Sequence, residues 1–364
     1  MLNTIYTHSV FQPEEFSHGG CKRTAQIHEI LIKNSIPFNI LDFKDYKFDK
    51  KKISSYLKGI LSNKRISSNF RNEIRTGNSI DIFKKELDKQ KPSFFIWESV
   101  SNHYSLLSKE LHNRKIPFIA VPHNIESLVK GNISFTSGKQ APNWFQEELS
   151  YLKLANKVFT ISLEEQWLLS TFGIETDFLP YYPTSNTTNY LLEIRKQREL
   201  KDKVSNPKNL LLLGTFYNPP TRRGNIELIE HIASLENITI NVVGFGSEIL
   251  NNLNLKNVKV WGSVSNEKLK DIIIENDAVL LHQEPTSGAL TKMSELLIAG
   301  IPIFANYISG RTYHNTPGVN VYFNFSELLN LLNTVKLTIP PIPKPPVEAE
   351  KRFVDTIKAI LNKN

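Results

Sequence analysis

The feature that most constrains the fold is an alternation between short apolar runs rich in β-branched residues and longer segments with helical spacing. The alternation occurs twice, once in each half of the 364-residue chain. Strands that alternate with helices in this way build βαβ units, whose strands form parallel sheets. The chain is long enough to bury two ordinary hydrophobic cores, so we predict two α/β domains.

In the first half, six apolar runs predict strands, namely Thr4–His8, Pro37–Leu41, Ser93–Trp97, Pro117–Val121, Lys157–Ile161 and Thr176–Leu179. The helices predicted between them include Thr24–Lys33, Tyr104–Asn113 and Leu163–Phe172. In the second half, the predicted strands are Asn209–Gly214, Thr239–Val243, Val258–Trp261, Ala278–His282, Pro302–Ala305 and Asn320–Phe323. They alternate with helices near residues 224–234, 266–275, 290–299 and 326–333.

These elements predict an α/β fold of two facing, Rossmann-like, doubly wound domains, which cover residues 1–185 and 208–337. Residues 186–207 are polar and charged without a strand pattern, and we expect a connecting helix and linker there. The segment 338–347 contains five prolines, which forbid a helix and favour an extended crossover. Helical spacing resumes within 348–364, and we expect this terminal helix to return to the first domain.

The composition and the N-terminal residues indicate the cellular compartment of the protein. No apolar run approaches the roughly 18 residues that a membrane span needs. The N-terminus lacks the basic and apolar regions of a signal peptide, and the single cysteine, Cys21, cannot form an internal disulfide. We therefore expect a cytoplasmic protein.

The net charge of +8 is concentrated in one segment. Between Lys44 and Arg75 there are ten basic and three acidic residues, which give +7 and leave the rest of the chain close to neutral. This distribution argues against a nucleic-acid-binding protein. Within residues 50–65, apolar side chains follow helical spacing among lysines, as in a helix that lies on an anionic membrane surface. The protein would then be peripheral on the inner face of the membrane, where a lipid-linked acceptor is found.

The same segment has a simpler interpretation. In that alternative, the lysines are merely solvated and the first domain buries the apolar side chains, which are Ile53, Tyr56, Leu57, Ile60 and Leu61.

In doubly wound folds ligands bind at the carboxyl ends of the strands, and two turns of the first domain carry suitable residues there. His18-Gly19-Gly20 precedes the first helix, where paired glycines let the backbone approach a ligand and the helix N-terminus favours an anion. His123 and Asn124 follow a predicted strand, where the imidazole would donate to a sugar hydroxyl or to a developing charge. A plain flexible turn and a capping turn are the alternatives.

Two arginines, Arg222 and Arg223, lie at a predicted helix start after the strand that ends at Gly214. Basic residues at this position oppose the helix dipole unless an anion is bound. Their forked donors and the helix N-terminus suit a diphosphate, whereas a solvated surface pair is the alternative.

The strongest motif is Ser287–Pro302, which turns at Gly288 into a helix that carries Lys292 and Glu295. In this interpretation Lys292 adds positive charge to a phosphate site and Glu295 accepts two ribose hydroxyls. The amide groups expected to contact the phosphate are those of Gly288, Ala289 and Leu290. The alternative is an ordinary ion pair between Lys292 and Glu295, which are three residues apart.

In their order and spacing, several segments resemble the retaining glycosyltransferases of family 4 (glycosyl transferases group 1), which have the GT-B fold. The resemblance covers most of the chain and rests on Gly19-Gly20, Phe159–Ser162 with Leu179-Pro180, Val243–Glu248, Val258–Val264, Asn276–Leu281 and Lys292–Pro302. It implies transfer of a hexose-type sugar from a nucleotide-diphosphate donor to a glycan or lipid-linked acceptor, with retention of configuration, as in polysaccharide biosynthesis. No resident cofactor is expected, and because neither half contains an Asp-x-Asp loop, no metal site is expected either.

The resemblance also assigns roles to individual residues of the donor site. Glu295 corresponds to the second, ribose-binding carboxylate of the family's motif of two glutamates separated by seven residues. Ser287 stands where the first glutamate is expected, so either Ser287 or the nearby Glu284 would contact the donor sugar.

The diphosphate-binding cations of the family are matched only in part. Arg223 corresponds to the cation just before a glycine, and we nominate Lys292 as the second, because Thr215 and Phe216 occupy the other usual position. His123 is similar to the family's cleft histidine. The backbone from Gly262 to Val264 would contact the base of the nucleotide.

Three other functions compete with sugar transfer. A sugar-nucleotide epimerase shares the architecture but needs catalytic carboxylates that the sequence does not identify. A non-catalytic partner subunit of the same fold is consistent with Ser287 in place of the glutamate. A dinucleotide oxidoreductase is disfavoured because Gly244-x-Gly246 lacks the third glycine of the dinucleotide-binding motif.

Overall fold

The computed structural model describes residues 4–43, 53–63, 70–98, 102–134, 137–201, 207–233, 235, 237–253 and 255–363. The chain forms two compact units. The first contains the residues up to Glu14, Arg23–Tyr181 and those from Pro346 onward, and the second contains Glu15–Lys22 and Tyr182–Pro345. A short segment near the N-terminus, Glu15–Lys22, therefore belongs to the second unit.

The first unit is built on a parallel six-stranded sheet with the order β2-β1-β3-β4-β5-β6. Its strands are β1 (Ile5–His8), β2 (Asn39–Ile40), β3 (Phe94–Trp97), β4 (Phe118–Ala120), β5 (Lys157–Thr160) and β6 (Thr176–Phe178). The helices are α1 (Gly19–Lys33), α2 (Ile53–Asn63), α3 (Phe70–Gln90), α4 (Ser105–Asn113), α5 (Asn143–Leu152), α6 (Leu163–Thr171) and α13 (Val347–Leu361).

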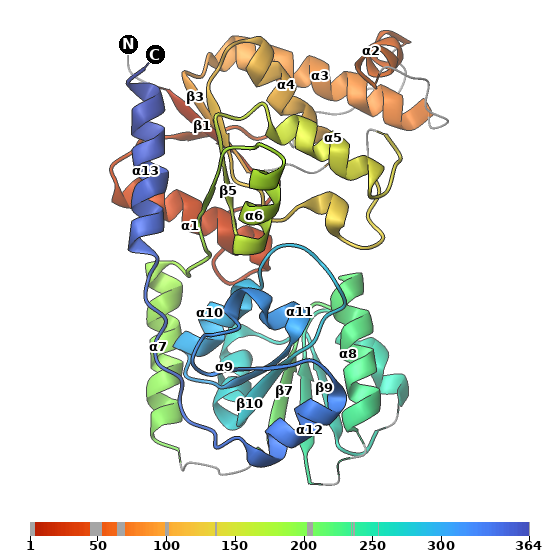
Figure 1. Ribbon diagram of the computed structural model, residues 1–364, viewed down its shortest axis with the longest axis vertical. Helices are drawn as coiled ribbons and strands as arrows, with labels where there is room; N and C mark the ends of the chain where they lie inside the picture. Colours follow the sequence, from red (N-terminus) through yellow and green to blue (C-terminus); the bar gives the residue numbers. More distant parts are fainter. Residues whose placement is uncertain are drawn as a thin grey trace. The chain divides into compact units, whose positions relative to one another are not determined.

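Helices cover both faces of this sheet (Figure 1). Alternate residues of β3 point to opposite faces, so Phe94 and Ile96 pack with α1 and α13, whereas Phe95 and Trp97 pack with α3, α4 and α5. The core on the α13 side includes Phe353 and Ile357, both fully buried. Burial on both faces explains why the strands are continuous apolar runs in the sequence.

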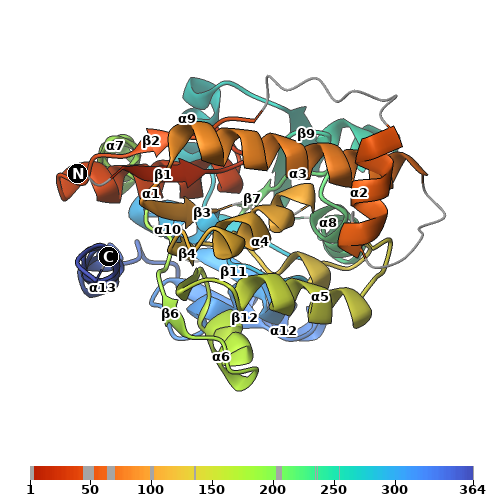
Figure 2. The same cartoon turned by 90° about the horizontal axis from the view of Figure 1, so that it is seen from above.

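Helix α2 packs against the first half of α3 (Figure 2). A Cβ atom at Gly59 would lie 2.1 Å from the Glu73 carbonyl oxygen, and one at Gly77 would lie 1.8 Å from the Ser55 carbonyl oxygen. Only glycine allows the two backbones to approach so closely at these positions. The small residues of α2 therefore face α3.

The second unit also contains a parallel six-stranded sheet, with the order β12-β11-β10-β7-β8-β9. Its strands are β7 (Asn209–Leu213), β8 (Thr239–Val243), β9 (Val258–Gly262), β10 (Ala278–Leu281), β11 (Ile303–Asn306) and β12 (Val319–Tyr322). The helices are α7 (Ser185–Glu199), α8 (Pro219–Ile232), α9 (Asn266–Glu275), α10 (Thr291–Ile298), α11 (Tyr307–Gly310) and α12 (Phe325–Thr334). Helices α7, α9 and α10 cover one face of the sheet, and α8 and α12 cover the other (Figure 1).

Helix α7 is bound to the second unit by a buried arginine. The Arg198 guanidinium donates from Nη1 to the carbonyl oxygen of Asn276 at 2.6 Å and from Nε to that of Gly300 at 3.0 Å. These carbonyl groups follow the ends of α9 and α10, where the helices leave acceptors unsatisfied. Burial lowers the pKa of Arg198 to about 10. Because Ile194 on the same helix is fully buried as well, α7 is part of the core of this unit.

The predicted α/β architecture is confirmed, and each predicted strand is present with ends that differ by at most two residues. Helix starts are predicted less well, since α1 begins at Gly19 rather than at Thr24 and α8 begins at Pro219 rather than near residue 224. Proline is favoured in the first turn of a helix, which explains the early start of α8. In the described residues, no helix combines the length and the apolar character that a membrane crossing requires.

Candidate functional site

The first candidate site lies where the strand order of the second sheet reverses. Strand β7 is followed along the chain by β8 on one side, but its other neighbour is β10. The loops that follow β7 and β10 therefore leave the same sheet edge in opposite directions, and ligands of doubly wound folds bind at such points. Helix α10, which carries Lys292 and Glu295, follows β10.

Lys292 links α10, the helix that follows β10, to the end of β7. Its ammonium group donates to the carbonyl oxygen of Leu213, the last residue of β7, at 2.8 Å. Burial and the nearby Lys22 ammonium lower the pKa of Lys292 to about 8, and the Glu295 carboxylate opposes them only in part. Burial and Lys22 therefore make the charged form of Lys292 less favourable than it is in water.

Lys22 is the residue that pairs with Glu295, with the Lys22 ammonium 2.6 Å from Glu295 Oε2. Lys22 belongs to the segment Glu15–Lys22 of the second unit, which also brings Gly19 next to α10. A Cβ at Gly19 would lie 3.1 Å from the Thr291 hydroxyl. The Glu295 carboxylate thus lies at a hydrogen-bonding distance from Lys22, and it also acts electrostatically on Lys292 in the same helix, as the alternative prediction of an ion pair within α10 expects in part.

The chain turns at Gly288 into α10, and this helix begins one residue after the predicted start near residue 290. The helix begins at Thr291, with Leu290 as its N-terminal cap residue, so Gly288 and Ala289 precede the helix. Gly288 has φ +78°, and its carbonyl oxygen accepts a hydrogen bond from Arg311. The free amide groups at the start of the helix include that of Leu290, whereas Gly288 and Ala289 lie in the preceding turn. Ser287 is half-buried before this turn.

Arg223 and Glu284, both nominated for the donor site, form an ion pair with Arg223 Nε 2.5 Å from Glu284 Oε2. Glu284 lies in the loop after β10, and its amide donates to the carbonyl of Pro220 in the first turn of α8. Arg222 is half-buried beside Arg223, whose side chain is 43% exposed. A bound diphosphate would therefore compete with Glu284 for Arg223.

The residues expected to contact a nucleotide base lie at the end of β9. Gly262 is the last residue of this strand, with φ +70°, and a Cβ there would lie 2.5 Å from Glu248 Oε1. Val264 is half-buried beyond it. The Glu248 side chain therefore lies against Gly262, a contact that the sequence did not predict.

The second candidate site belongs to the first unit, again where the strand order reverses, between β1 and β3. Glu98 follows β3 and is fully buried; its Oε1 accepts a hydrogen bond from the Thr7 hydroxyl at 2.6 Å. The His123 ring nitrogen Nε2 lies 3.9 Å from Glu98 Oε2, and His28 Nε2 lies 3.9 Å from Oε1. His123 thus has a buried carboxylate beside it, which the sequence did not predict.

The charge of Glu98 is stabilised in this position. Burial alone would raise the pKa of its carboxyl group, but the contacts with His123, His28 and Thr7 outweigh burial and hold that pKa below its ordinary value. Glu98 Oε2 and both ring nitrogens of His123 are buried without a hydrogen-bond partner in the described part of the chain. Buried polar atoms of this kind are costly unless a ligand or water satisfies them.

Two further buried carboxylates fix the loop that carries His123. Glu165 accepts a hydrogen bond from the amide of Ile125 at 3.0 Å. Glu148 accepts from the amides of Glu126 and Ser127 at 2.9 and 3.0 Å, and burial raises its pKa to about 7. The loop after β4 is therefore fixed by α5 and α6. Among the described residues, no group of three or more His, Cys, Asp and Glu side chains is arranged to hold a metal ion.

A scan against protein-family models gives no match, and neither does a search of curated proteins. Solved structures match over nearly the whole chain. The Anabaena HepE structure in complex with UDP is 14% identical, covers 98% of this chain and 100% of its own, and has a TM-score of 0.60. Sucrose-phosphate synthase from Thermosynechococcus elongatus is 15% identical over 99% of this chain and 97% of its own, with a TM-score of 0.59. The fold is GT-B.

Other proteins of the GT-B fold are also similar to this chain. UDP-GlcNAc 2-epimerase from Methanocaldococcus jannaschii, in complex with UDP-GlcNAc and UDP, is 15% identical over 98% of this chain and 99% of its own, with a TM-score of 0.53. Sequence identities this low show the fold alone, and the reaction depends on the residues at the site.

Proposed function

We propose that the protein is a glycosyltransferase of the retaining family 4 type, which moves a sugar from a nucleotide diphosphate to a glycan or lipid-linked acceptor without a metal ion. The observation that carries the proposal is the cluster of Lys22, Lys292 and Glu295 at the reversal point of the second sheet. Two ammonium groups lie beside one carboxylate there, and burial together with the Lys22 charge lowers the pKa of Lys292 to about 8. An anionic diphosphate would favour the charged form of Lys292.

The solved structures support the same class of ligand. HepE has been solved in complex with UDP and in complex with UDP and glucose. The other similar structure is, by its name, that of an enzyme that makes sucrose phosphate. We assign the nucleotide sugar to the second unit and the acceptor to the first.

The proposed reaction breaks the bond between the anomeric carbon and the diphosphate oxygen. The acceptor oxygen forms the new bond on the same face of the sugar, and its proton passes to the departing diphosphate. Lys292 and Arg223 stabilise the charge that develops on the diphosphate. His123, with Glu98 beside it, donates a hydrogen bond to a sugar hydroxyl. No nucleic acid is involved.

The similarity to a UDP-GlcNAc 2-epimerase favours a second candidate reaction, epimerisation of a nucleotide sugar. Incubation with a panel of nucleotide sugars, with and without added glycan or lipid-linked acceptors, distinguishes the two. Transfer gives a glycosylated acceptor with retained configuration and free nucleoside diphosphate. Epimerisation gives a new nucleotide sugar without any acceptor, and this result would replace the proposal.

Replacing Glu284 by glutamine is expected to raise the affinity for UDP by up to about fivefold. Glu284 pairs with Arg223 in the free protein, and an exposed ion pair contributes at most about 1 kcal/mol. The measurement is calorimetric titration with UDP and with UDP-glucose. A gain for UDP together with a loss for UDP-glucose would show that Glu284 contacts the sugar.

The control for this variant is Glu230→Gln, which removes an exposed carboxylate of α8. If both variants bind UDP like the parent protein, Glu284 does not restrain Arg223 and the phosphates lie elsewhere.

We propose further that α2 lies on an anionic membrane, where a lipid-linked acceptor is reached. Three apolar side chains spaced by four residues, Ile53, Leu57 and Leu61, are 75%, 54% and 76% exposed. The close contact of Gly59 with α3 directs these side chains away from the first unit. Lys58 is exposed beside them, whereas the other lysines predicted for this surface, Lys50 to Lys52 and Lys64 with Arg65, lie outside the described residues.

Vesicles that contain anionic lipid are expected to co-sediment with the protein at low salt, and added salt should weaken the association. The triple variant Ile53→Ser, Leu57→Ser, Leu61→Ser should lose most of it, because these side chains enter the lipid. Replacing Lys50, Lys51, Lys52 and Lys58 by glutamine should also weaken the association with the vesicles.

A control triple variant changes the exposed Ile32, Leu200 and Ile342 to serine and should leave the association unchanged. Equal sedimentation with neutral and anionic vesicles would exclude this part of the proposal.

A further inference from the structure

A cavity of about 660 Å³ lies at the amino-terminal edge of the first sheet, which is the edge opposite to His123. Its walls come from the starts of β4 and β5, from the turn that precedes β4, and from the last turns of α13. All of these elements belong to the first unit. The volume is typical of sites for small molecules, and none of the proposed donor or acceptor residues lines it.

The charge of the lining is strongly positive. The charged side chains of the lining are Lys115, Lys157, Lys363 and Glu175, which together carry a net charge of +2. His112 adds an imidazole ring to the lining. Within the described parts of the chain, no carboxylate lies within ion-pair distance of Lys115 or Lys363. A concave site with this charge favours an anion.

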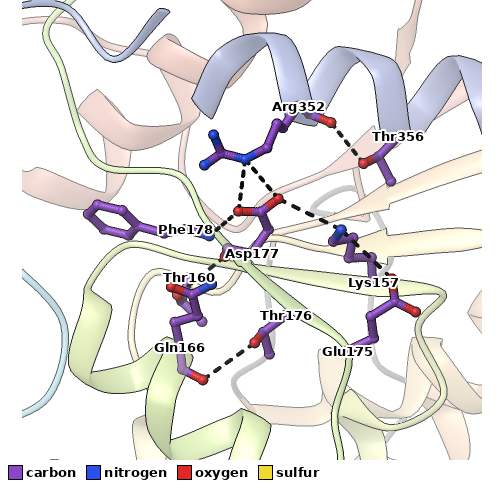
Figure 3. Close-up of polar contacts among 9 residues, drawn as sticks. All are labelled: Lys157, Thr160, Gln166, Glu175, Thr176, Asp177, Phe178, Arg352 and Thr356. Atoms are coloured by element: carbon purple, nitrogen blue, oxygen red, sulfur yellow. Dashed lines mark hydrogen bonds and ion pairs between the residues drawn. The ribbon is translucent and has the colours of Figure 1, made fainter. Parts of the chain in front are cut away.

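Figure 3 shows the contacts of a second carboxylate beside the cavity, that of Asp177. Asp177 is occupied by Arg352 of α13, whose Nε lies 3.2 and 3.1 Å from its two oxygens, and by the amide of Phe178 at 2.8 Å. Lys157 lies between Asp177 and Glu175, 3.7 Å from an oxygen of each. These contacts anchor α13 beside the cavity, and Lys115 and Lys363 keep their charge for a ligand.

Most of the remaining lining is apolar, with Asn156 and Thr356 as its polar members. The apolar residues are Ile116, Pro117, Phe118, Leu154, Ala359 and Ile360. Inorganic phosphate alone would leave this surface exposed to water. A ligand with an apolar body would cover it, at about 25 cal/mol for each Å² removed from water.

We propose that this cavity binds an organic phosphate, with its dianionic phosphate at Lys115, Lys157 and Lys363 and its apolar body against Leu154, Ala359 and Ile360. A phosphate monoester carries a charge near −2 at neutral pH, which matches the lining. The ligand contacts α13 and the starts of β4 and β5 together, so binding holds α13 on the sheet. The site is separate from the nucleotide site of the proposed function and does not depend on it.

The lysines have a simpler explanation, which predicts the opposite result in a binding experiment. Lys115 follows the end of α4 and Lys363 follows the end of α13, where positive charge stabilises the helix dipole without any ligand. In that case the cavity binds no organic phosphate.

The test is calorimetric titration of the full chain with phenyl phosphate, with inorganic phosphate and phenol as partial probes. Phenyl phosphate should bind at least tenfold more tightly than either, and saturating UDP should not displace it. Hydrogen exchange of α13 amides should slow on binding. No binding, equal binding of inorganic phosphate, or displacement by UDP would overturn the proposal.

Two variants test the charge and the shape of the site separately. Lys115→Gln with Lys363→Gln should weaken phenyl phosphate at least tenfold, whereas Lys153→Gln with Lys358→Gln removes the same charge from exposed positions outside the cavity and should not. Ala359→Phe should fill the apolar part and abolish binding with the charges intact. Equal losses in the two lysine pairs would show that only the overall charge matters and would exclude the site.

Discussion

Replacing Lys292 by glutamine is expected to slow sugar transfer by about two orders of magnitude or more, the usual effect of removing one group that stabilises charge in a transition state. The ammonium group is held at the reversal point by the Leu213 carbonyl, 2.8 Å away, and Lys22 already pairs with Glu295. Lys292 is the one basic residue of α10, so no other side chain of this described helix can take over its charge. The measurement is kcat with saturating donor, together with the affinity for UDP. Lys336→Gln, an exposed lysine after α12, is the control.

The pH dependence of UDP binding adds a second test of Lys292. Its pKa is lowered to about 8, so the free protein loses this positive charge as the pH rises through 8. A bound diphosphate favours the protonated form, and affinity should therefore fall by up to about tenfold per pH unit above 8. Lys292→Arg stays charged and should remove this decline. A decline that persists in the arginine variant would assign it to another group.

Glu98→Gln is expected to reduce kcat by about a hundredfold with little change in donor affinity, because it removes the carboxylate beside His123. Glutamine keeps an oxygen for the Thr7 hydroxyl but cannot stabilise positive charge on His123 or His28. If Glu98 acts through His123, the double variant with His123→Ala should be no slower than His123→Ala alone.

Thr7→Val provides the control for this cycle, since it removes the hydrogen bond to Glu98 and leaves its charge in place. It should have a smaller effect on kcat. Additive losses in the double variant would show that Glu98 acts independently of His123, and unfolding measurements on each variant separate this from lost stability.

The strands could be predicted because parallel strands buried on both faces must be apolar throughout, and Phe94 to Trp97 is an example. Helix starts depend on capping and on local turns, which explains why α1 and α8 begin at residues other than those predicted. Helix α2 shows a further limit. Its apolar residues suggest a buried face, but the close approach at Gly59 and Gly77 buries the small residues instead.

The sequence predicted which residue types form the candidate site, but it did not predict which side chains contact one another. A lysine and a glutamate on the helix after β10 were visible in the sequence, but the partner of Glu295 is Lys22, which is 273 residues away. Likewise nothing near His123 in the sequence points to Glu98. Such contacts arise only when the topology brings distant strand ends to one edge of a sheet.

The position of α7 determines which fragments of this protein can fold by themselves. Although its sequence suggests a connector, Ile194 and Arg198 are part of the second core, and Arg198 satisfies the carbonyls beyond α9 and α10. A fragment cut at residue 208 would leave those carbonyls without their donor and expose the apolar surface that Ile194 covers. A fragment used to study the second unit should therefore include α7, and the long continuous part of this unit, which lacks Glu15–Lys22, begins at Tyr182.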